Sequence, residues 1–567
     1  MVCDLINRVF ELYQKFSLYF HAIRYLKPVQ IYGRLFFVLH RPKPDLAPAP
    51  KRSELQGPWV TPPLRKQSLV GPATFDHLNQ KFSLPNDGAW DVAGPSRLWN
   101  YHLHYFDDLM AEGFLERRGR HRDLVQSWIR HNPPMQGTGW EPYPLSRRVV
   151  NWIKADLTPS FLDNAALSSL AIQARYLTRR CERHLQGNHL WINAKALIFA
   201  GLFFDGAAGP GEAGKWLAQG MLLAGRGIKD QVKPDGGHYE QSPMYHAFMV
   251  EDLLDLINLG RACAWAELDG FKETAARMLG YLQGVCHPDG QIVLFNDAAF
   301  NMGPSPGQLL DYGQRLGIGP VNVSEQGEGW RHYPDSGVVC LKAGPWTLFW
   351  DTGPIGPDHI PGHAHADSLT LELSWNRQRV IVDTGTGEYG VSPERLHQRG
   401  TSAHNTVMID GRNSSEVWAG FRVARRARPL GRATITQVDG QTICRAGHDG
   451  YKRIRGKVLH WRKIITDKEN IVIEDEIQGR GQHLAELFWH FHPEIDVRPS
   501  DDKWFLLHAG LGKIGEMTIQ GAEDIQLIFA TYHPEFGLSL ETKKLVAKTR
   551  GPLPIKFLTR ISSFNSQ

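Results

Sequence analysis

Two kinds of hydrophobic periodicity divide this chain of 567 residues. Between about residues 95 and 310, apolar residues recur every three or four positions, which is typical of helices with one buried face. In the segment NAALSSLAIQARYL, for example, Leu167, Leu170, Ala171, Ala174 and Leu177 fall on one side of a helix. The first half of the chain is therefore predicted to be a helical domain.

After about residue 330 the period changes to two. Segments such as TLELSWNRQRVIVDTG and KIITDKENIVIEDEI are short β-rich runs, separated by the turn residues Gly, Asn and Asp. Strands that follow one another without intervening helices indicate an antiparallel sandwich. We therefore predict a helical domain followed by a β domain, with any active site at their junction.

The first 63 residues differ from both domains. Residues 1–41 read as an aromatic, basic helix, which could rest on a membrane surface or dock on the rest of the protein, and we favour docking. Residues 41–63 contain seven prolines, which interrupt a helix and stiffen a linker. The predicted units are thus a helical segment with a linker at 1–63, a helical domain at 64–325 and a β domain at 326–567.

Composition narrows the function only slightly. Lys and Arg together number 64 against 59 for Asp and Glu, a mild surplus that suits an anionic ligand and gives no reason to expect nucleic acid. No uncharged apolar run is long enough to predict a membrane span. The N-terminus does not read as a cleavable signal, and the six cysteines form no CxxC pair, so the cytoplasm is the default expectation.

A polar trio opens the segment GHAHADSLTLELSW at residues 362–375. His363, His365 and Asp367 occupy alternate positions, and the leucines that follow continue the same parity toward a buried face. Imidazoles in such a place need partners, because burying an unpaired polar group is costly. This segment is therefore a candidate for chemistry as well as for packing.

Two further clusters lie in the helical half. Asn188 and His189 stand at the start of a predicted helix, where an asparagine is as often simply a helix cap. The segment DGGHYEQSPMYHAF concentrates titratable groups around a Ser-Pro helix start. Its candidates are Glu240, Tyr245 and His246.

His365, Asp383 and His404 are suitable zinc ligands at separations of 18 and 21 residues. Spacing alone leaves a hydrogen-bonded core histidine as the commoner alternative. If Asn376 begins a two-residue hairpin turn, Asp383 does not face His365 across the strands. Metal binding then requires residues 362–367 to leave the strand and bend back.

Taken together, these motifs resemble the heparinase II/III-like polysaccharide lyases over roughly residues 95–560. The marks of the resemblance are Asn188-His189, EQSPMYH, HAHAD, VDTGTGEY and SAHNTV, in the order of the family, with FWHFHP as a further likeness. The resemblance implies an (α/α) toroid followed by an antiparallel β-sandwich. Secreted members usually carry a signal peptide, so the cell envelope is the alternative to the cytoplasm.

The resemblance also implies an activity, the β-elimination of uronic-acid-containing polysaccharides. By similarity Asn188, with His189, neutralises the uronate carboxylate so that the C5 proton can leave. Tyr245 is the acid that protonates the 4-O leaving group, and His363 is the base or its partner. A phenol needs nearby cations to act as a base itself, so Tyr245 could serve both steps only beside such charges.

Substrate and metal contacts follow from the same resemblance. Arg148 is the expected grip on substrate carboxylates, with its neighbour Arg147 as the other candidate, and Glu240 and His246 are expected near the sugar. A structural zinc is expected on His365, Asp383 and His404, where it would tie the loop of His363 to the sandwich. The partner is an acidic polysaccharide, and bacterial exopolysaccharides are among the candidates.

Two other functions stay open. (α/α) toroids also carry glycoside hydrolases, for which Asp235 with Glu240 or Asp297 could supply the two carboxylates. A noncatalytic protein that binds or assembles polysaccharide could keep the same fold.

Overall fold

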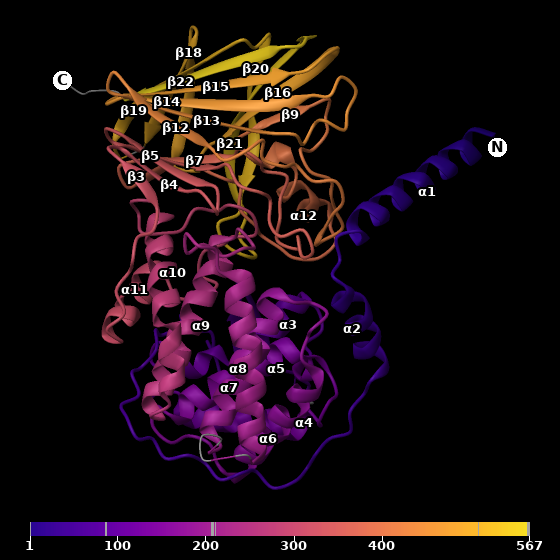
Figure 1. Ribbon diagram of the computed structural model, residues 1–567, viewed down its shortest axis with the longest axis vertical. Helices are drawn as coiled ribbons and strands as arrows, with labels where there is room; N and C mark the ends of the chain where they lie inside the picture. Colours follow the sequence, from indigo (N-terminus) through magenta and orange to yellow (C-terminus); the bar gives the residue numbers. More distant parts are fainter. Residues whose placement is uncertain (1, 86–87, 206–208, 210, 509, 564–567) are drawn as a thin grey trace.

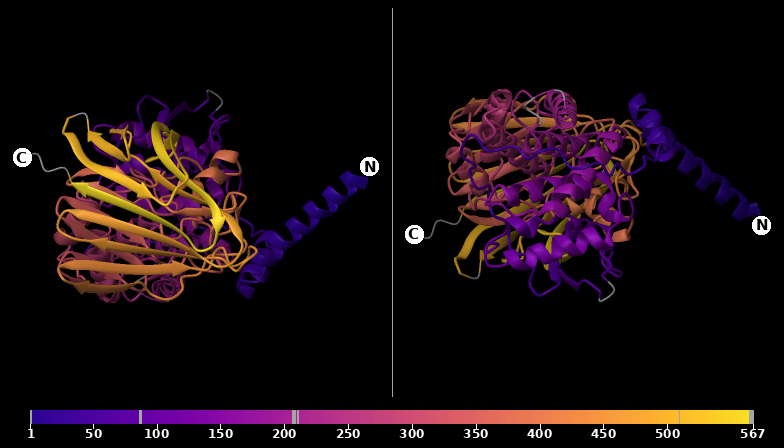
Figure 2. Two further views of the ribbon diagram at one scale, coloured as in Figure 1. Left: turned by 90° about the horizontal axis from the view of Figure 1, so that it is seen from above. Right: turned by 90° about the horizontal axis from the view of Figure 1, so that it is seen from below.

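The computed structural model describes residues 2–85, 88–205, 209, 211–508 and 510–563, with the side chains of the helix at the N-terminus described from Leu12. Helices form one half of the molecule and sheets the other, and a helix at the N-terminus projects away from both (Figure 1). Seen from above, the strands of the β half lie over the helices (Figure 2). The chain thus has the predicted order, a helical domain and then a β domain.

The helical domain is an (α/α) toroid around a buried helix. α7 is apolar on nearly all sides and packs against α5, α8 and α9. The domain contains α3 (Arg97–Tyr105), α4 (Arg118–His131), α5 (Pro142–Asp156), α6 (Asn164–Arg180), α7 (Gly187–Phe203), α8 (Glu212–Gln231), α9 (Pro243–Ala262), α10 (Lys272–Gly284) and α11 (Pro306–Arg315).

α6 confirms the helical periodicity. Its predicted face is buried at Leu170, Ala171, Ala174 and Leu177, whereas Leu167 is only partly buried. Asp163 begins the helix, because its side chain accepts a hydrogen bond from the backbone N–H of Ala166. The spacing of apolar residues therefore gave both the element and its buried side.

Within the described residues the β domain contains three larger antiparallel sheets. The first runs β3 (Glu325–Gly327), β4 (Trp330–Tyr333), β5 (Val338–Ala343), β6 (Trp346–Asp351), β7 (Leu371–Trp375), β8 (Gln378–Ile381). The second runs β12 (Thr434–Val438), β13 (Gln441–His448), β14 (Leu459–Thr466), β15 (Asn470–Gln478), β22 (Ile555–Ser563), β19 (Gly512–Gln520), β18 (Lys503–His508), β17 (Ile495–Ser500). The third runs β20 (Asp524–Tyr532), β21 (Leu540–Pro552), β16 (Gln482–His490), β9 (Val407–Ile409).

The three sheets share one hydrophobic core. Trp346 of β6, Phe557 of β22 and Trp489 of β16 are all nearly fully buried in it. β14 and β15 alternate strictly between buried and half-buried positions, as a period of two requires. Smaller elements are the ribbons β1 (Thr74–His77) with β2 (Gln80–Ser83) and β10 (Val417–Trp418) with β11 (Arg422–Val423), and the helix α12 (Pro393–Gln398).

The segment that carries the polar trio is not part of a strand. β7 begins only at Leu371, so residues 362–367 lie in the loop that connects β6 to β7. Trp375 pairs with Gln378 across the expected turn, and a register shift follows between Leu373 and Ser374. The requirement that 362–367 leave the strand is therefore met.

The N-terminal arm, residues 2–39, consists of α1 (Val2–Ile23) and α2 (Pro28–Leu39). α2 and the end of α1 lie on the protein, while apolar side chains such as Leu12 and Phe16 of α1 are exposed. No helix in the described ranges has the length and apolar character needed to cross a membrane. The proline-rich segment then runs along the toroid, where the backbone N–H of Ser53 donates to Phe203.

Candidate active site

A cavity of about 730 Å³ opens between the toroid and the loops of the β domain. Both domains contribute residues to its lining, as expected for an active site at their junction. Among the polar residues of its lining, five could transfer a proton or bind an anion: Asn188, His189, Tyr245, His363 and Tyr389. Four of the five come from the clusters selected in the sequence, and the fifth belongs to the VDTGTGEY motif.

Asn188 is not a helix cap. The N-cap of α7 is Gln186, and Gly187 has a positive φ of 52° where the chain turns into the helix. A Cβ atom on Gly187 would lie 2.4 Å from Oε1 of Glu240, so only glycine fits. This close approach lets the backbone N–H of Asn188 donate to Glu240 at 3.3 Å, while its side chain lines the cavity.

His189 follows on the same turn of α7. Its Nδ1 lies 3.1 Å from Oε2 of Glu182, and its ring centroid is 4.7 Å from that of Tyr143. Burial by itself would lower the pKa of His189, but the Glu182 carboxylate outweighs that effect and the pKa is raised. Because Glu182 favours its cationic form, the imidazole beside the Asn188 amide suits an anionic ligand.

Tyr245 stands in the first turn of α9, whose start is fixed by Ser242. Its ring stacks on that of His363 with centroids 3.9 Å apart, and its hydroxyl lies 3.0 Å from the hydroxyl of Tyr389. Burial raises the pKa of Tyr245 well above its usual value. The phenol is therefore a proton donor at neutral pH, which excludes the phenolate form in this resting arrangement.

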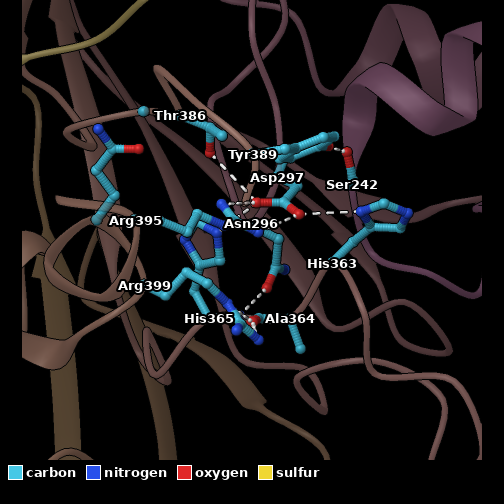
Figure 3. A network of polar contacts seen from close by, with 12 residues as sticks. Ser242, Asn296, Asp297, His363, Ala364, His365, Thr386, Tyr389, Arg395 and Arg399 are labelled. Carbon is cyan, nitrogen blue, oxygen red and sulfur yellow. Dashed lines mark hydrogen bonds and ion pairs between the residues drawn. The ribbon is translucent and has the colours of Figure 1, made fainter. Parts of the chain in front are cut away.

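His363 is oriented by a buried aspartate that the sequence analysis used only as a hydrolase candidate. Nδ1 of His363 lies 3.0 Å from Asp297, and Nε2 of His365 lies 2.8 Å from the same carboxylate (Figure 3). Arg395 donates two hydrogen bonds to Asp297, at 2.5 and 2.7 Å. Burial would raise the pKa of Asp297, but Arg395 and the two histidines outweigh it and hold that pKa well below its usual range.

The other ring nitrogen of His363 faces the toroid. Its Nε2 lies 3.5 Å from Oε2 of Glu240, whose Oε1 accepts from Asn188. Burial raises the pKa of the Glu240 carboxyl. A continuous chain of contacts therefore joins Asn188, Glu240, His363 and Tyr245. Of these, Asn188, His363 and Tyr245 line the cavity.

The expected zinc ligands lie close together, with the ring centroids of His365 and His404 5.3 Å apart. Nδ1 of His404 lies 2.7 Å from Asp383. As placed, no three His, Cys, Asp or Glu side chains of the described ranges are arranged to hold a metal. Yet in those ranges Nδ1 of His365, Nε2 of His404 and both carboxylate oxygens of Asp367 are buried without a hydrogen-bond partner. Such a donor set fits a divalent cation.

Three expected substrate contacts do not line the cavity: Arg148, His246 and Glu240, whose side chain is buried. Arg148 is fully buried, donates to Gln173 and to backbone carbonyls, and stacks on Trp128 at 3.8 Å. His246 is also buried, with Nε2 2.9 Å from the carbonyl of Met278. Both side chains serve the core of the toroid, so neither can bind substrate from there. Arg147, one position earlier on α5, does line the cavity.

The comparisons with known proteins agree with this architecture. Residues 123–303 match the model "Heparinase II/III N-terminus" and residues 325–561 match "Heparinase II/III-like, C-terminal". A heparin-sulfate lyase of Bacteroides stercoris is 26% identical over 382 residues, covering 60% of this chain and 51% of the relative. One from Pedobacter heparinus is 24% identical over 416 residues, covering 66% and 58%.

The crystal structure of a heparinase III matches with a TM-score of 0.68 at 18% identity, covering 86% of this chain and 81% of that one, and so shows a common fold. The chain spans about half the length of the curated relatives it matches. One match covers the helical domain and the other the β domain, in the order that the family has. The chain is therefore a member of the heparinase II/III-like family.

Proposed function

We propose that this protein is a polysaccharide lyase that cleaves an acidic polysaccharide by β-elimination at a uronic acid unit. The proposal rests on one observation: a single cavity is lined by the amide of Asn188, the phenol of Tyr245 and the imidazole of His363. The names of the similar proteins, heparin-sulfate lyases, support the same class of substrate.

The difficult step of this reaction is removal of the C5 proton, because negative charge then accumulates on the neighbouring carboxylate. In the proposed complex the Asn188 amide donates to that carboxylate and the cationic His189 offsets its charge. Fixed donors of this kind stabilise developing charge without reorganisation. The side chain of Asn188 has no protein hydrogen bond within the described ranges, so its amide is available to a ligand.

The proton steps divide between the two stacked rings. His363 takes the C5 proton, the C5–H electrons form the C4=C5 double bond, and the C4–O bond breaks. The departing oxygen takes the proton of Tyr245, which is a donor because burial raises its pKa. Return of a proton from His363 to Tyr245 by way of solvent restores the resting state, so the proton lost from C5 balances the proton gained by the leaving oxygen.

A glycoside hydrolase is less well supported. Asp235 receives hydrogen bonds from Ser336 and Gly237, and neither it nor Glu240 nor Asp297 lines the cavity. A hydrolytic pair must reach the glycosidic oxygen and a water. The acids that do line the cavity each contact a basic side chain: Asp107 with Arg147, Glu141 with Arg97 and Glu182 with His189.

We also propose a structural zinc beside this site, held by His365, His404 and a carboxylate of Asp383 or Asp367. The bound ion would supply a fixed tie between the loop of His363 and the sandwich. Support comes from the partnerless buried atoms of His365, His404 and Asp367. Elemental analysis of purified protein should find about one zinc per chain, and His404→Ala should lower the metal content and the thermal midpoint. Purified protein that contains no metal, and whose thermal midpoint does not change when a chelator is added, would refute the zinc.

The test of the activity is a panel of uronate polymers: alginate, heparosan, hyaluronan, chondroitin and native bacterial exopolysaccharides. A lyase forms a conjugated double bond, so ultraviolet absorbance should rise with at least one polymer. New reducing ends without absorbance would indicate a hydrolase instead. Binding with neither product, unchanged in Tyr245→Phe and His363→Ala, would indicate a noncatalytic polysaccharide-binding protein.

A further inference from the structure

The N-terminal arm supplies one wall of the cavity. Three residues of α2 are part of its lining, together with residues of the toroid and of the β-domain loops: Arg34, Phe37 and Val38. α2 precedes both stretches that match the family, which begin at residues 123 and 325. This wall is therefore a feature of the present chain beyond the matched domains.

α2 is held firmly on the toroid. The Arg180 guanidinium covers the ring of Phe37 at 3.6 Å and donates to the carbonyl of His40 at 2.6 Å. The ring of Phe37 also contacts that of His184 at 4.4 Å. A Cβ on Gly33 would lie 3.3 Å from the Cβ of His184, so the helix approaches the toroid closely at this point. This close contact also fixes the backbone position of the next residue, Arg34.

The arm also reaches the β domain. The side chain of Gln30 donates to the carbonyl of His359 at 2.9 Å. Arg426 covers the ring of Tyr25 at 4.1 Å, and Tyr19 packs edge-on against Trp418 with centroids 4.9 Å apart. Because the arm contacts both domains, it spans the junction where they enclose the cavity.

Arg34 differs from the other arginines of the lining. Arg97 is paired with Glu141, Arg147 with Asp107, and Arg180 is bound to backbone carbonyls. Arg34 is exposed, and no hydrogen bond or ion pair engages it within the described ranges. Among the arginines of the lining, Arg34 is thus the one whose guanidinium is available to an anion.

We propose that α2 forms a subsite of the cleft, in which Arg34 binds the acidic group of a sugar unit beyond the one that is cleaved. This inference rests on the proposed function for the identity of the substrate. The acidic group is a uronate carboxylate or a sulfate, both of which match the fork of a guanidinium. Since Arg34 lies on α2 and is not among the groups proposed to act on the cleaved unit, it should matter for longer oligosaccharides and not for the shortest ones.

The experiment compares Arg34→Glu with Arg34→Lys and with Lys15→Glu in the full chain. Lys15→Glu is the matched control, because it makes the same charge change on an exposed residue of α1 that does not line the cavity. With a hexasaccharide substrate, Arg34→Glu should raise KM by about three- to tenfold with kcat nearly constant, and Arg34→Lys should restore most of the loss. With the shortest substrate that is cleaved, the three variants should resemble the unmodified protein.

Calorimetric binding of the same oligosaccharides to Tyr245→Phe, with and without Arg34→Glu, separates the two proposals. Binding weakened by Arg34→Glu, with no unsaturated product formed from the same oligosaccharides by the unmodified protein, would overturn the lyase and keep the subsite. Equal affinity for the hexasaccharide in both proteins, or an equal change in Lys15→Glu, would overturn the subsite alone. If no acidic oligosaccharide binds, both proposals are overturned.

Discussion

The two walls of the cavity are built in different ways. The toroid presents Asn188 and Tyr245 from the first turns of α7 and α9, where the helix backbone fixes them. The β domain presents His363 and Tyr389 from loops, and the loops depend on side-chain contacts to Asp297 and Arg395. A helix start thus holds a reacting group by itself, whereas a loop needs a buried charged network to do the same.

Removing the proton donor from the helical wall should have the largest effect. Tyr245→Phe keeps the ring that stacks on His363 but deletes the hydroxyl, so turnover should fall by about 10²–10⁴-fold. Oligosaccharide affinity should change little, as measured by calorimetry. Tyr389→Phe is the control, since it removes only the neighbouring hydroxyl. Full activity in Tyr245→Phe would contradict the assignment.

The loop wall should collapse when its network is broken. Asp297→Asn leaves the buried Arg395 without its counter-charge, which should cost about 3–5 kcal/mol of unfolding free energy in denaturant titration. Activity should fall with it, because His363 loses its orientation. Asp311→Asn breaks an exposed pair with Arg315 and should cost less than about 0.5 kcal/mol. Equal losses in the two variants would show that the network has no special role.

Asn188→Ala should impair the chemistry without destabilising either wall of the cavity. The amide makes no side-chain hydrogen bond in the described ranges, so the thermal midpoint should hold. Loss of one donor to developing charge should lower kcat by about 10²–10³-fold. If kcat were unchanged and only KM rose, Asn188 would hold the ground-state substrate rather than the transition state.

The smallest expected effect is a pH dependence of stability from His189. Glu182 raises the pKa of His189 in the folded protein above its value in the unfolded chain. The stabilisation is therefore complete below about pH 6.5 and is lost as pH rises through the folded pKa. In His189→Gln the thermal midpoint should decline less between pH 6 and pH 8. An identical decline in both proteins would contradict the ion pair.

The sequence predicted the fold well, because periodicity reports local structure. It separated the toroid from the sandwich and placed the buried face of α6. It could not distinguish Arg147 from Arg148, since α5 is buried on almost every side and a single step of the helix decides which arginine reaches the cavity. Two separate local motifs identified Asn188 and Tyr245 as candidates. That the two side chains line one cavity depends on how α7 and α9 pack together, which local sequence does not show.

Asp297 was weighed only as a hydrolytic carboxylate because its partners are distant along the chain. It lies 66 residues from His363 and 98 from Arg395, so no local spacing connects them. A buried carboxylate among apolar residues was the available signal, since such a group requires partners. The zinc ligands and the domain limits at 63 and 325 stay predictions.

We propose that the residues of the two walls together remove a proton from C5 and do not add water across the glycosidic bond. Mass spectrometry of the products from whichever uronate polymer is degraded tests this most directly. We expect fragments with an unsaturated, water-deficient unit at the new non-reducing end, and none of these fragments with Tyr245→Phe. Saturated fragments that incorporate oxygen from labelled water would contradict it.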